Sequence, residues 1–266
     1  MPESTSTDLP KTNIIAVGDI HGMSNVLNLL FGHLEKNFSS DNTQFVFLGD
    51  LVDRGPESAP TMDLVAKILD LYPRSKLILG NHDHYLREFL RGGIVYEEEV
   101  EWLQMGGIQT LRSYNVDQAS FGWGDLFLAG KSVSAAYPHH LELLEKAVPS
   151  FETLNHFFTH AGVDPEVPLA DQWVYNLMWI REEFLDYTGH FEKTIVHGHT
   201  ITKSELPEVR ANRISLDSGS FATRRVSAAI FSDDVLNGFV VAEINECAQV
   251  IRLFDAEMQA TPILWT

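Results

Sequence analysis

The sequence predicts an α/β fold, because segments with the pattern of strands alternate with segments with the pattern of helices through the first third of the chain. Apolar strand-like runs also end repeatedly in a small residue that is followed by a side chain able to bind a metal. The 266 residues are 44% hydrophobic and 21% charged, which is the composition of an ordinary globular protein. Strands joined by helices imply parallel pairing through right-handed crossovers.

The first strand is expected at residues 13–17, which are apolar and rich in β-branched side chains. A helix should follow, because apolar residues then recur at helical spacing, at Val26, Leu27, Leu30, Phe31 and Leu34. The pattern repeats with a strand at 44–48 and a helix at about 60–70, in which Pro60 suits the first turn. A third strand is predicted at 76–79 and a third helix at 85–91.

Residues 92–155 are less regular, since Gly106-Gly107, Gly122 and Gly124 interrupt them. We interpret this segment as a mainly helical insertion that covers the active-site edge of the sheet. Shorter strands are expected from Arg213 onward, and residues 238–244 and 249–254 should pair as an antiparallel hairpin. The chain has no repeat and no low-complexity linker, so we expect one domain over residues 12–266 behind a flexible tail of residues 1–11.

The net charge of −18 argues against partners that bind through basic patches. Nucleic acid and anionic membranes are therefore not expected as partners, and metal ions with a few arginines must bind any phosphate. The one cysteine, Cys247, excludes an intramolecular disulfide and a thiolate metal site, and we expect an inert, half-buried thiol. The polar first eleven residues lack the features of a secretory signal, and the expected location is the cytoplasm.

Side chains suited to metal binding follow the strand-like runs directly. In an open α/β sheet, ligands bind beyond the carboxyl ends of the strands, so these side chains should converge as a metal cluster at one edge of the sheet. Aspartate and histidine are expected ligands of manganese, iron, zinc or cobalt, and an asparagine oxygen would limit the negative charge that repels phosphate. The residues concerned are Asp19, His21, Asp50, Asn81, His82, His160, His197 and His199.

Five segments together resemble the signature of the calcineurin-like metallophosphoesterases. They are Gly18-Asp19-Ile20-His21-Gly22, Gly49-Asp50-Leu51-Val52-Asp53-Arg54-Gly55, Gly80-Asn81-His82-Asp83, His160-Ala161-Gly162 and His197-Gly198-His199-Thr200. The second of them resembles the phosphoprotein phosphatase branch. Further features resemble the bacterial serine/threonine phosphatases of this branch, which include those like the bacteriophage lambda phosphatase. These features are Pro56, Trp102 with Gly106-Gly107, and Met178-Trp179-Ile180-Arg181-Glu182. The resemblance covers residues 13 to about 221 and implies a β-sandwich flanked by helices.

The resemblance also implies two divalent metal ions, manganese first, with iron or zinc as alternatives. Asp19 and His21 would hold one ion, Asp50 would bridge both, and Asn81, His160 and His199 would hold the other. A hydroxide shared by the ions would attack phosphorus directly, and His82, oriented by Asp53, would act as the general acid. The residues implied for phosphate binding are Arg54, Arg181 and Asn81.

Several residues in these motifs have a plainer interpretation. His199 is favoured over His197 as the ligand, and His197 is expected to be a packed histidine. Other metallophosphoesterases carry a further histidine where this chain has Ile201, and the phosphoprotein phosphatase branch does not. Asp83 is expected to be structural, and His84 is expected on the surface.

Other residues are assigned to structure or to the surface. The adjacent His139 and His140 are expected to be an adventitious surface pair rather than a third metal site. The turn Asp217-Ser218-Gly219 is expected to be structural. Tryptophans expected to pack in the core or the insertion are Trp102, Trp123, Trp173 and Trp179, with Trp123 an alternative lining of a substrate groove.

The activity implied is that of a phosphomonoesterase acting on phosphoserine or phosphothreonine in proteins, or on a small phosphoester. One alternative is symmetrical hydrolysis of diadenosine tetraphosphate, and another is broad specificity that includes phosphotyrosine. An inactive scaffold is the least favoured, because such proteins lose ligands or the acid and this chain has kept them all.

Overall fold

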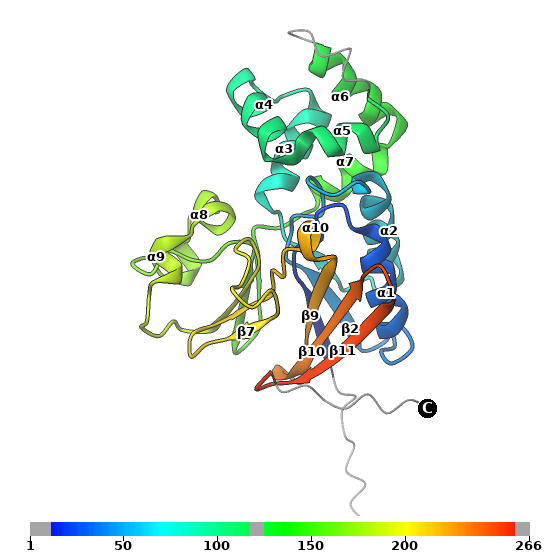
Figure 1. The fold of residues 1–266 in the computed structure, drawn as a ribbon. Helices are drawn as coiled ribbons and strands as arrows, with labels where there is room; N and C mark the ends of the chain where they lie inside the picture. The colour runs from blue at the N-terminus through cyan, green and yellow to red at the C-terminus, as the bar shows by residue number, and fades with distance from the viewer. Residues whose placement is uncertain (1–11, 117–124, 259–266) are drawn as a thin grey trace, which may run out of the picture.

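The structure, a computed structural model, describes residues 12–116 and 125–258 and consists of two sheets packed face to face and flanked by helices (Figure 1). This confirms the α/β class and the helix-flanked sandwich. The first sheet runs in the order β11 (Gln249–Asp255), β10 (Val235–Ile244), β9 (Arg225–Ser232), β1 (Asn13–Val17), β2 (Thr43–Phe47) and β3 (Lys76–Leu77). The second runs β4 (Ser150–Glu152), β5 (His156–Thr159), β6 (Thr194–His197), β8 (Arg213–Ser215) and β7 (Glu208–Val209).

Strand β1 shows why the first sheet lies in the middle of the molecule. Ile15 and Val17 belong to the apolar cluster shared with the helices, whereas Ile14 and Ala16 belong to the cluster shared with the second sheet. Successive side chains of a strand point to opposite faces, so a run that is apolar throughout is suited to burial on both faces. The parallel pairing of β1 with β2 and of β2 with β3 confirms the crossover topology expected from the sequence.

Two layers of helices complete the fold. Helices α1 (Ser24–Leu34) and α2 (Ser58–Leu71) cover the outer face of the first sheet. A mainly helical segment stands over the strand ends in Figure 1, with α3 (Asn81–Arg91), α4 (Tyr96–Trp102), the kinked turn η1 (Leu103–Gly107), α5 (Ile108–Ser113), α6 (Asp125–Ala136) and α7 (Pro138–Glu145). The second sheet carries η3 (Leu169–Asp171), α8 (Val174–Trp179) and α9 (Glu182–Leu185), and α10 (Ser220–Thr223) precedes β9.

Some element boundaries differ from those expected. The helix predicted at 85–91 begins at Asn81, because Asp83 accepts a hydrogen bond from the backbone N–H of Gly80 and so completes a helix start. The strand predicted at 76–79 ends at Leu77, and Ile78 makes an isolated bridge to Val148. The strands after residue 213 are not all short, since β10 has 10 residues.

Other expectations are confirmed, are wrong, or fall outside the described residues. The five apolar residues of α1 are buried, and β10 pairs antiparallel with β11. Cys247 is exposed rather than half-buried. The tail of residues 1–11 and Gly122, Trp123 and Gly124 lie outside the described residues, and the single domain stays a prediction. No helix in the described part of the chain is long and apolar enough to cross a membrane.

Candidate dinuclear metal site

The site lies where parallel strands of both sheets end. The expectation that the ligands gather at the edge of one sheet is wrong: β1, β2 and β3 belong to the first sheet, and β5 and β6 to the second. Face-to-face packing of the two sheets brings the five strand ends together, so each sheet supplies part of the site. The side chains that meet there are buried, namely Asp19, His21, Asp50, Asn81, His82, His160 and His199.

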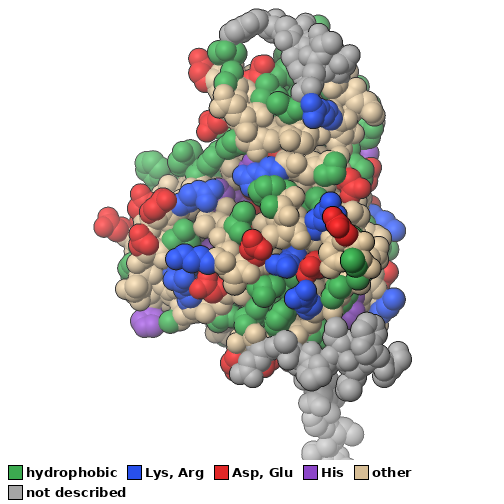
Figure 2. Space-filling view, in the orientation of Figure 1, with side chains coloured by type: hydrophobic (Ala, Val, Ile, Leu, Met, Phe, Trp, Pro, Cys, Tyr) green, Lys and Arg blue, Asp and Glu red, His purple; other side chains and the backbone are tan. Residues whose placement is uncertain are grey.

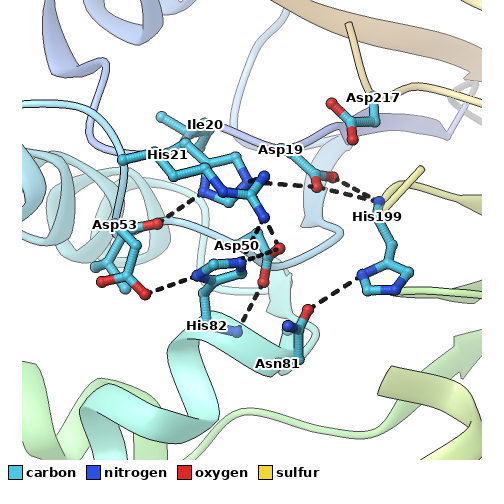
Figure 3. A network of polar contacts seen from close by, with 12 residues as sticks. Asp19, Ile20, His21, Asp50, Asp53, Asn81, His82, His199 and Asp217 are labelled. Atoms are coloured by element: carbon cyan, nitrogen blue, oxygen red, sulfur yellow. Dashed lines mark hydrogen bonds and ion pairs between the residues drawn. The ribbon is translucent and has the colours of Figure 1, made fainter. Parts of the chain in front are cut away.

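Asp50 occupies the centre of this group (Figure 3). Its Oδ2 lies 3.6 Å from His21 Nε2 on one side and 3.4 Å from His160 Nε2 on the other. Its Oδ1 accepts a hydrogen bond of 3.1 Å from the backbone N–H of His82, which fixes the carboxylate. One carboxylate therefore faces two groups of nitrogen and oxygen donors, the arrangement needed to bridge two metal ions.

One group of donors has the spacing of a single metal site. His160 Nε2 lies 3.0 Å from Asn81 Oδ1 and 3.1 Å from His199 Nδ1, which lies 3.1 Å from the same Asn81 oxygen. His160 Nδ1 donates to the carbonyl oxygen of Leu48 at 2.8 Å, so its Nε2 faces the other two atoms and would be the atom that binds a metal. Two imidazole nitrogens and an amide oxygen at this spacing can share one divalent cation.

The other group of donors is formed by His21 and Asp19, and Arg54 binds one of them. His21 Nδ1 donates to the carbonyl oxygen of Val52 at 2.8 Å, which leaves its Nε2 as an acceptor. Arg54 Nη1 donates to that Nε2 at 2.9 Å, so the guanidinium stands in for the cation that His21 is oriented to bind. The carboxylate of Asp19 lies 4.0 Å from the same nitrogen and accepts two hydrogen bonds from the backbone N–H of His199, at 3.0 and 3.1 Å.

The protonation behaviour of the cluster also fits a cation site. Burial raises the pKa of Asp19 well above its usual value, and Asp217 adds to the effect. Burial lowers the pKa of His160, but Asp50 outweighs it and raises that pKa to about 9. Burial, with the neighbouring His160, lowers the pKa of His199 to about 2. Without metal, the buried carboxylates are thus balanced by protons, which divalent ions would replace.

A histidine–aspartate pair lies beside Asp50. His82 Nδ1 is 2.7 Å from Asp53 Oδ2, and His82 Nε2 accepts a hydrogen bond from Arg54 Nη2 at 2.9 Å. Burial lowers the pKa of His82, but the nearby Asp50 and Asp53 carboxylates reverse this and raise it overall. The pair has the geometry by which a carboxylate orients an imidazole for proton transfer.

The helical insertion positions Asp53. Trp102 Nε1 donates to Asp53 Oδ2 at 2.9 Å, and Thr110 Oγ1 donates to Asp53 Oδ1 at 2.5 Å. The backbone N–H of Arg54 donates to the carbonyl oxygen of Gly106 at 3.2 Å. Sequence reasoning assigned Trp102 to packing and did not identify Thr110. For Trp102, the one sequence signal was its place beside Gly106-Gly107. Thr110 gave no signal, because its hydrogen bond to Asp53 spans 57 residues and leaves no local pattern.

Backbone strain is concentrated in the site. Several non-glycine residues adopt the left-handed conformation, among them His21 (φ 45°), Asp50 (φ 52°), Asp53 (φ 71°), Arg54 (φ 67°) and His199 (φ 63°). Each such residue costs of order 1–3 kcal/mol, and strain of this kind persists where the surrounding structure enforces it. Observed outliers in so many of the candidate residues support a functional site.

Two glycines allow the carboxylates to approach the backbone. A Cβ on Gly80 would collide with Asp50 Oδ1, and a Cβ on Gly198 would collide with the Asp19 carboxylate. A side chain at either position would therefore displace a candidate ligand. This explains why the small residue recurs directly before Asn81 and His199 in the sequence.

The comparisons with known proteins agree with this geometry. The family model of the calcineurin-like phosphoesterases matches residues 12–203. The chain belongs to this family. Two sheets, flanking helices and His/Asp clusters suited to binuclear metal binding are consistent with that membership.

Curated relatives include two kinds of tetraphosphatase. The asymmetrical bis(5'-nucleosyl)-tetraphosphatase PrpE of Oceanobacillus iheyensis is 26% identical over 243 residues, which span 82% of this chain and 88% of the relative. The symmetrical bis(5'-nucleosyl)-tetraphosphatase of Dechloromonas aromatica is 37% identical over 89 residues, 34% of this chain and 30% of the relative.

Solved structures share the fold. A structure provisionally described as a diadenosine tetraphosphatase has a TM-score of 0.55 at 21% identity, covering 92% of this chain and 97% of that one. A cold-active protein tyrosine phosphatase has a TM-score of 0.54 at 16% identity, covering 94% and 78%. At these identities the likeness shows the fold alone.

The rim of the site carries arginines and aromatic side chains. Arg181 is exposed, and its Nη1 donates to Thr200 Oγ1 at 3.1 Å. A pocket beside it is lined by Tyr175, Trp179 and Glu182, among others. Trp173 is 73% exposed, so the expectation that it packs in the core is wrong. Figure 2 shows basic and histidine side chains reaching the surface where the helical segment meets the sheets.

The remaining motif residues are mostly structural. His197 is buried, and its Nε2 lies 2.8 Å from Ser215 Oγ, so it is packed as expected. Asp83 accepts hydrogen bonds from the backbone N–H of Leu51 and of Gly80. Asp217 accepts one from Gly219, while its Oδ2 is buried without a partner among the described residues. His84 is half-buried, with Arg87 as a partner, so its expected place on the surface is only partly correct.

Proposed function

We propose that the protein is a dinuclear-metal phosphoesterase that hydrolyses dinucleoside tetraphosphates. The observation that carries the proposal is the central Asp50 carboxylate, which faces His21 on one side and His160 on the other at similar distances. A metal-binding residue shared between two donor groups is the arrangement of two-metal phosphate hydrolysis. The tetraphosphatase activity named for a relative that matches 82% of this chain supports the substrate class.

The proposed ligands are divided between two ions. Asp19 and His21 would hold the first, Asp50 would bridge, and the second would take Asn81, His160 and His199. Manganese is the first choice, with iron or zinc as alternatives, since imidazole and carboxylate suit all three. When bound, the ions would supply an acidified water as the nucleophile and positive charge for the phosphoryl oxygens.

The protein's own residues would supply binding and the proton. The two terminal nitrogens of Arg54 lie beside His21 and His82 respectively. In this position the guanidinium would donate two hydrogen bonds to two oxygens of the phosphoryl group. Arg181 and the Asn81 amide would bind the same phosphate. Once Arg54 binds the phosphate instead of His82, Nε2 of His82 would be free to carry a proton. His82, held at Nδ1 by Asp53, would then release that proton to the leaving oxygen.

The rim beside Arg181 suits a nucleotide. Tyr175 and Trp179 stack with ring centroids 6.1 Å apart and an interplanar angle of 20°, and Tyr175 is 66% exposed. Trp173 is also exposed, and Arg181 lies in the same pocket as Tyr175 and Trp179. Exposed aromatic faces next to a phosphate-binding arginine would stack on a nucleobase while the arginine binds the chain of phosphates.

The second candidate is a phosphatase acting on phosphoserine or phosphothreonine in a protein. It is favoured by the full Gly49–Gly55 motif and by Ile201 at the position where other metallophosphoesterases carry a histidine. Broad specificity that includes phosphotyrosine belongs to this candidate. For both candidates we propose a cytoplasmic enzyme. The charge of −18 argues against a nucleic-acid or membrane partner in either case.

A substrate panel tests the proposal. The manganese-loaded enzyme is assayed on diadenosine tetraphosphate, a phosphoserine peptide, a phosphotyrosine peptide and an aryl phosphate, with Asp50→Asn as the control for contaminating phosphatases. We expect kcat/KM on the dinucleotide to exceed that on the peptides by at least about tenfold. The nucleotide products show whether cleavage is symmetrical, giving two ADP, or asymmetrical, giving ATP and AMP. Preferred turnover of the phosphoserine peptide would establish the second candidate instead.

A further inference from the structure

A second group of metal-binding side chains lies outside the candidate dinuclear site and shares no residue with it. His139 and His140 both direct Nε2 at the same oxygen, Asp63 Oδ1, at 2.8 and 2.9 Å. Asp63 lies on α2, and the two histidines lie in the first turn of α7. Figure 1 shows these two helices side by side, with α5 above them.

His140 is not the surface residue expected from the sequence. Its side chain is completely buried, and its Nδ1 lies 2.8 Å from the hydroxyl of Tyr114, which is itself buried. The ring of Tyr137 stacks on it at 5.2 Å between centroids with an interplanar angle of 16°. A polar partner on one nitrogen and packing on the ring face fix the direction of Nε2, which is how proteins orient a metal-ligating histidine.

The distances suit a tetrahedral ion after a small adjustment. Zinc bonds of about 2.0–2.1 Å place tetrahedral ligand atoms roughly 3.4 Å apart. The candidate ligand atoms lie within 4.8 Å of one another, and each Nε2 lies within 2.9 Å of Asp63 Oδ1. The two Nε2–Oδ1 distances would need to lengthen by about 0.5 Å. The side chains of His139 and Asp63 are 49% and 55% exposed, so they can make this change while the buried His140 stays in place.

We propose that Asp63, His139 and His140 form a third metal site, specific for a borderline transition metal such as Zn²⁺, that fastens the helical insertion to α2. Imidazole and carboxylate together select such metals. Three protein ligands leave one position for water. The metal site would be connected to the candidate dinuclear site through α5. Thr110 on this helix donates a hydrogen bond to Asp53. Tyr114, which follows the helix directly, is the partner of His140.

Metal counting with a matched pair of variants tests this site. The full-length protein is loaded with Mn²⁺, equilibrated with micromolar Zn²⁺, freed of excess metal and analysed for total manganese plus zinc. We expect three metal ions per chain in the wild type and two in His139→Ala. In Glu142→Gln, which changes an exposed carboxylate on the same helix, the count should stay at three. Counting both metals makes the result independent of exchange in the dinuclear site.

A stability measurement and a crystal soak provide independent readouts. Zinc at about one hundred times its Kd should raise the Tm of the manganese-loaded wild type by about 5 °C and leave His139→Ala unchanged. Anomalous scattering at the zinc edge should show a peak between Asp63 and the two histidines. Equal metal counts in the wild type and His139→Ala, or no peak at this position, would show that the three side chains form hydrogen bonds only and would overturn the proposal.

Discussion

At the scale of single residues, His82 differs from the other buried histidines of the site in its partners. His21 and His160 each donate from Nδ1 to a backbone carbonyl, which leaves Nε2 as a lone pair for a metal. His82 instead has a carboxylate, Asp53, at Nδ1. A carboxylate at Nδ1 stabilises the protonated ring, which suits an acid, whereas a carbonyl oxygen at Nδ1 directs the lone pair of Nε2 at a metal.

The replacement His82→Asn therefore separates proton donation from metal binding. We expect kcat on an alkyl phosphoester to fall by roughly 100- to 10,000-fold, the usual contribution of general acid catalysis. The loss should be smaller on an aryl phosphate or a tetraphosphate, because those leaving groups are weak bases and need the proton less. Steady-state kinetics and metal analysis check this, and manganese content should match the wild type. An unchanged rate on the alkyl ester would rule out His82 as the donor.

At the scale of elements, α4 and α5 act as a support for Asp53. Trp102 and Thr110 donate to its two carboxylate oxygens from either side of the kink at Gly106. This arrangement could not be read from the sequence, because the contacts join residues about fifty positions apart. The strand ends were easier to anticipate, since each ligand follows its own strand within a few residues.

Trp102→Phe tests this support with little change in packing. It removes one hydrogen bond to Asp53 and keeps an aromatic ring against Phe89. We expect kcat to fall by about 10- to 100-fold with KM nearly unchanged, as for other residues that hold a catalytic partner in place. Kinetics with the manganese-loaded enzyme provide the measurement. Phe89→Leu serves as the packing control, and an equal loss of kcat there would assign the effect to packing.

The turn between β9 and β10 connects the two sheets. Asp234 accepts hydrogen bonds from Thr153 Oγ1 at 2.6 Å and from the backbone N–H of Asn155 at 2.7 Å, and it pairs with His156 Nδ1 at 2.8 Å. These partners flank the turn that joins β4 to β5 in the second sheet. The aspartate thus fastens one sheet to the other at the end of a hairpin.

Asp234→Asn should lower the free energy of unfolding by about 1–2 kcal/mol at pH 7, while asparagine tolerates the positive φ of 63°. Burial raises the Asp234 pKa, but the hydrogen bonds from Thr153 and His156 outweigh it, so the folded pKa lies below the unfolded one. The carboxylate's contribution is present above the unfolded pKa of about 3.9 and is lost as pH falls through the folded pKa. Urea unfolding at pH 7 and pH 3 checks this, with Glu246→Ala as a control. If Asp234→Asn lowered the free energy of unfolding by the same amount at both pH values, the prediction would be contradicted.

At the scale of the whole molecule, the α/β class and the helix-flanked sandwich were predicted, but the division of the ligand-bearing strands between two sheets was not. The spacing of glycines, aspartates and histidines identified side chains that do converge, although it placed them at one sheet edge. The second sheet was not visible from periodicity, because β5, β6 and β8 have only three or four residues each. The burial of His140 was equally hidden, since it depends on Tyr114 and on α2.

The bridging role of Asp50 is the claim on which the proposed activity depends. Its carboxylate lies near both His21 and His160, so its loss should affect both metal positions at once. Asp50→Asn keeps the size of the side chain and the hydrogen bond from His82, which makes misfolding a poor explanation of any effect.

The most direct test is the manganese content of the wild type and of Asp50→Asn after reconstitution and removal of excess metal. Manganese is suited to this count because it binds the imidazole-rich third site most weakly among the first-row divalent metals. We expect two ions per chain in the wild type, at most one in the variant, and loss of turnover with the loss of metal. A variant that retains two ions and full activity would contradict the account.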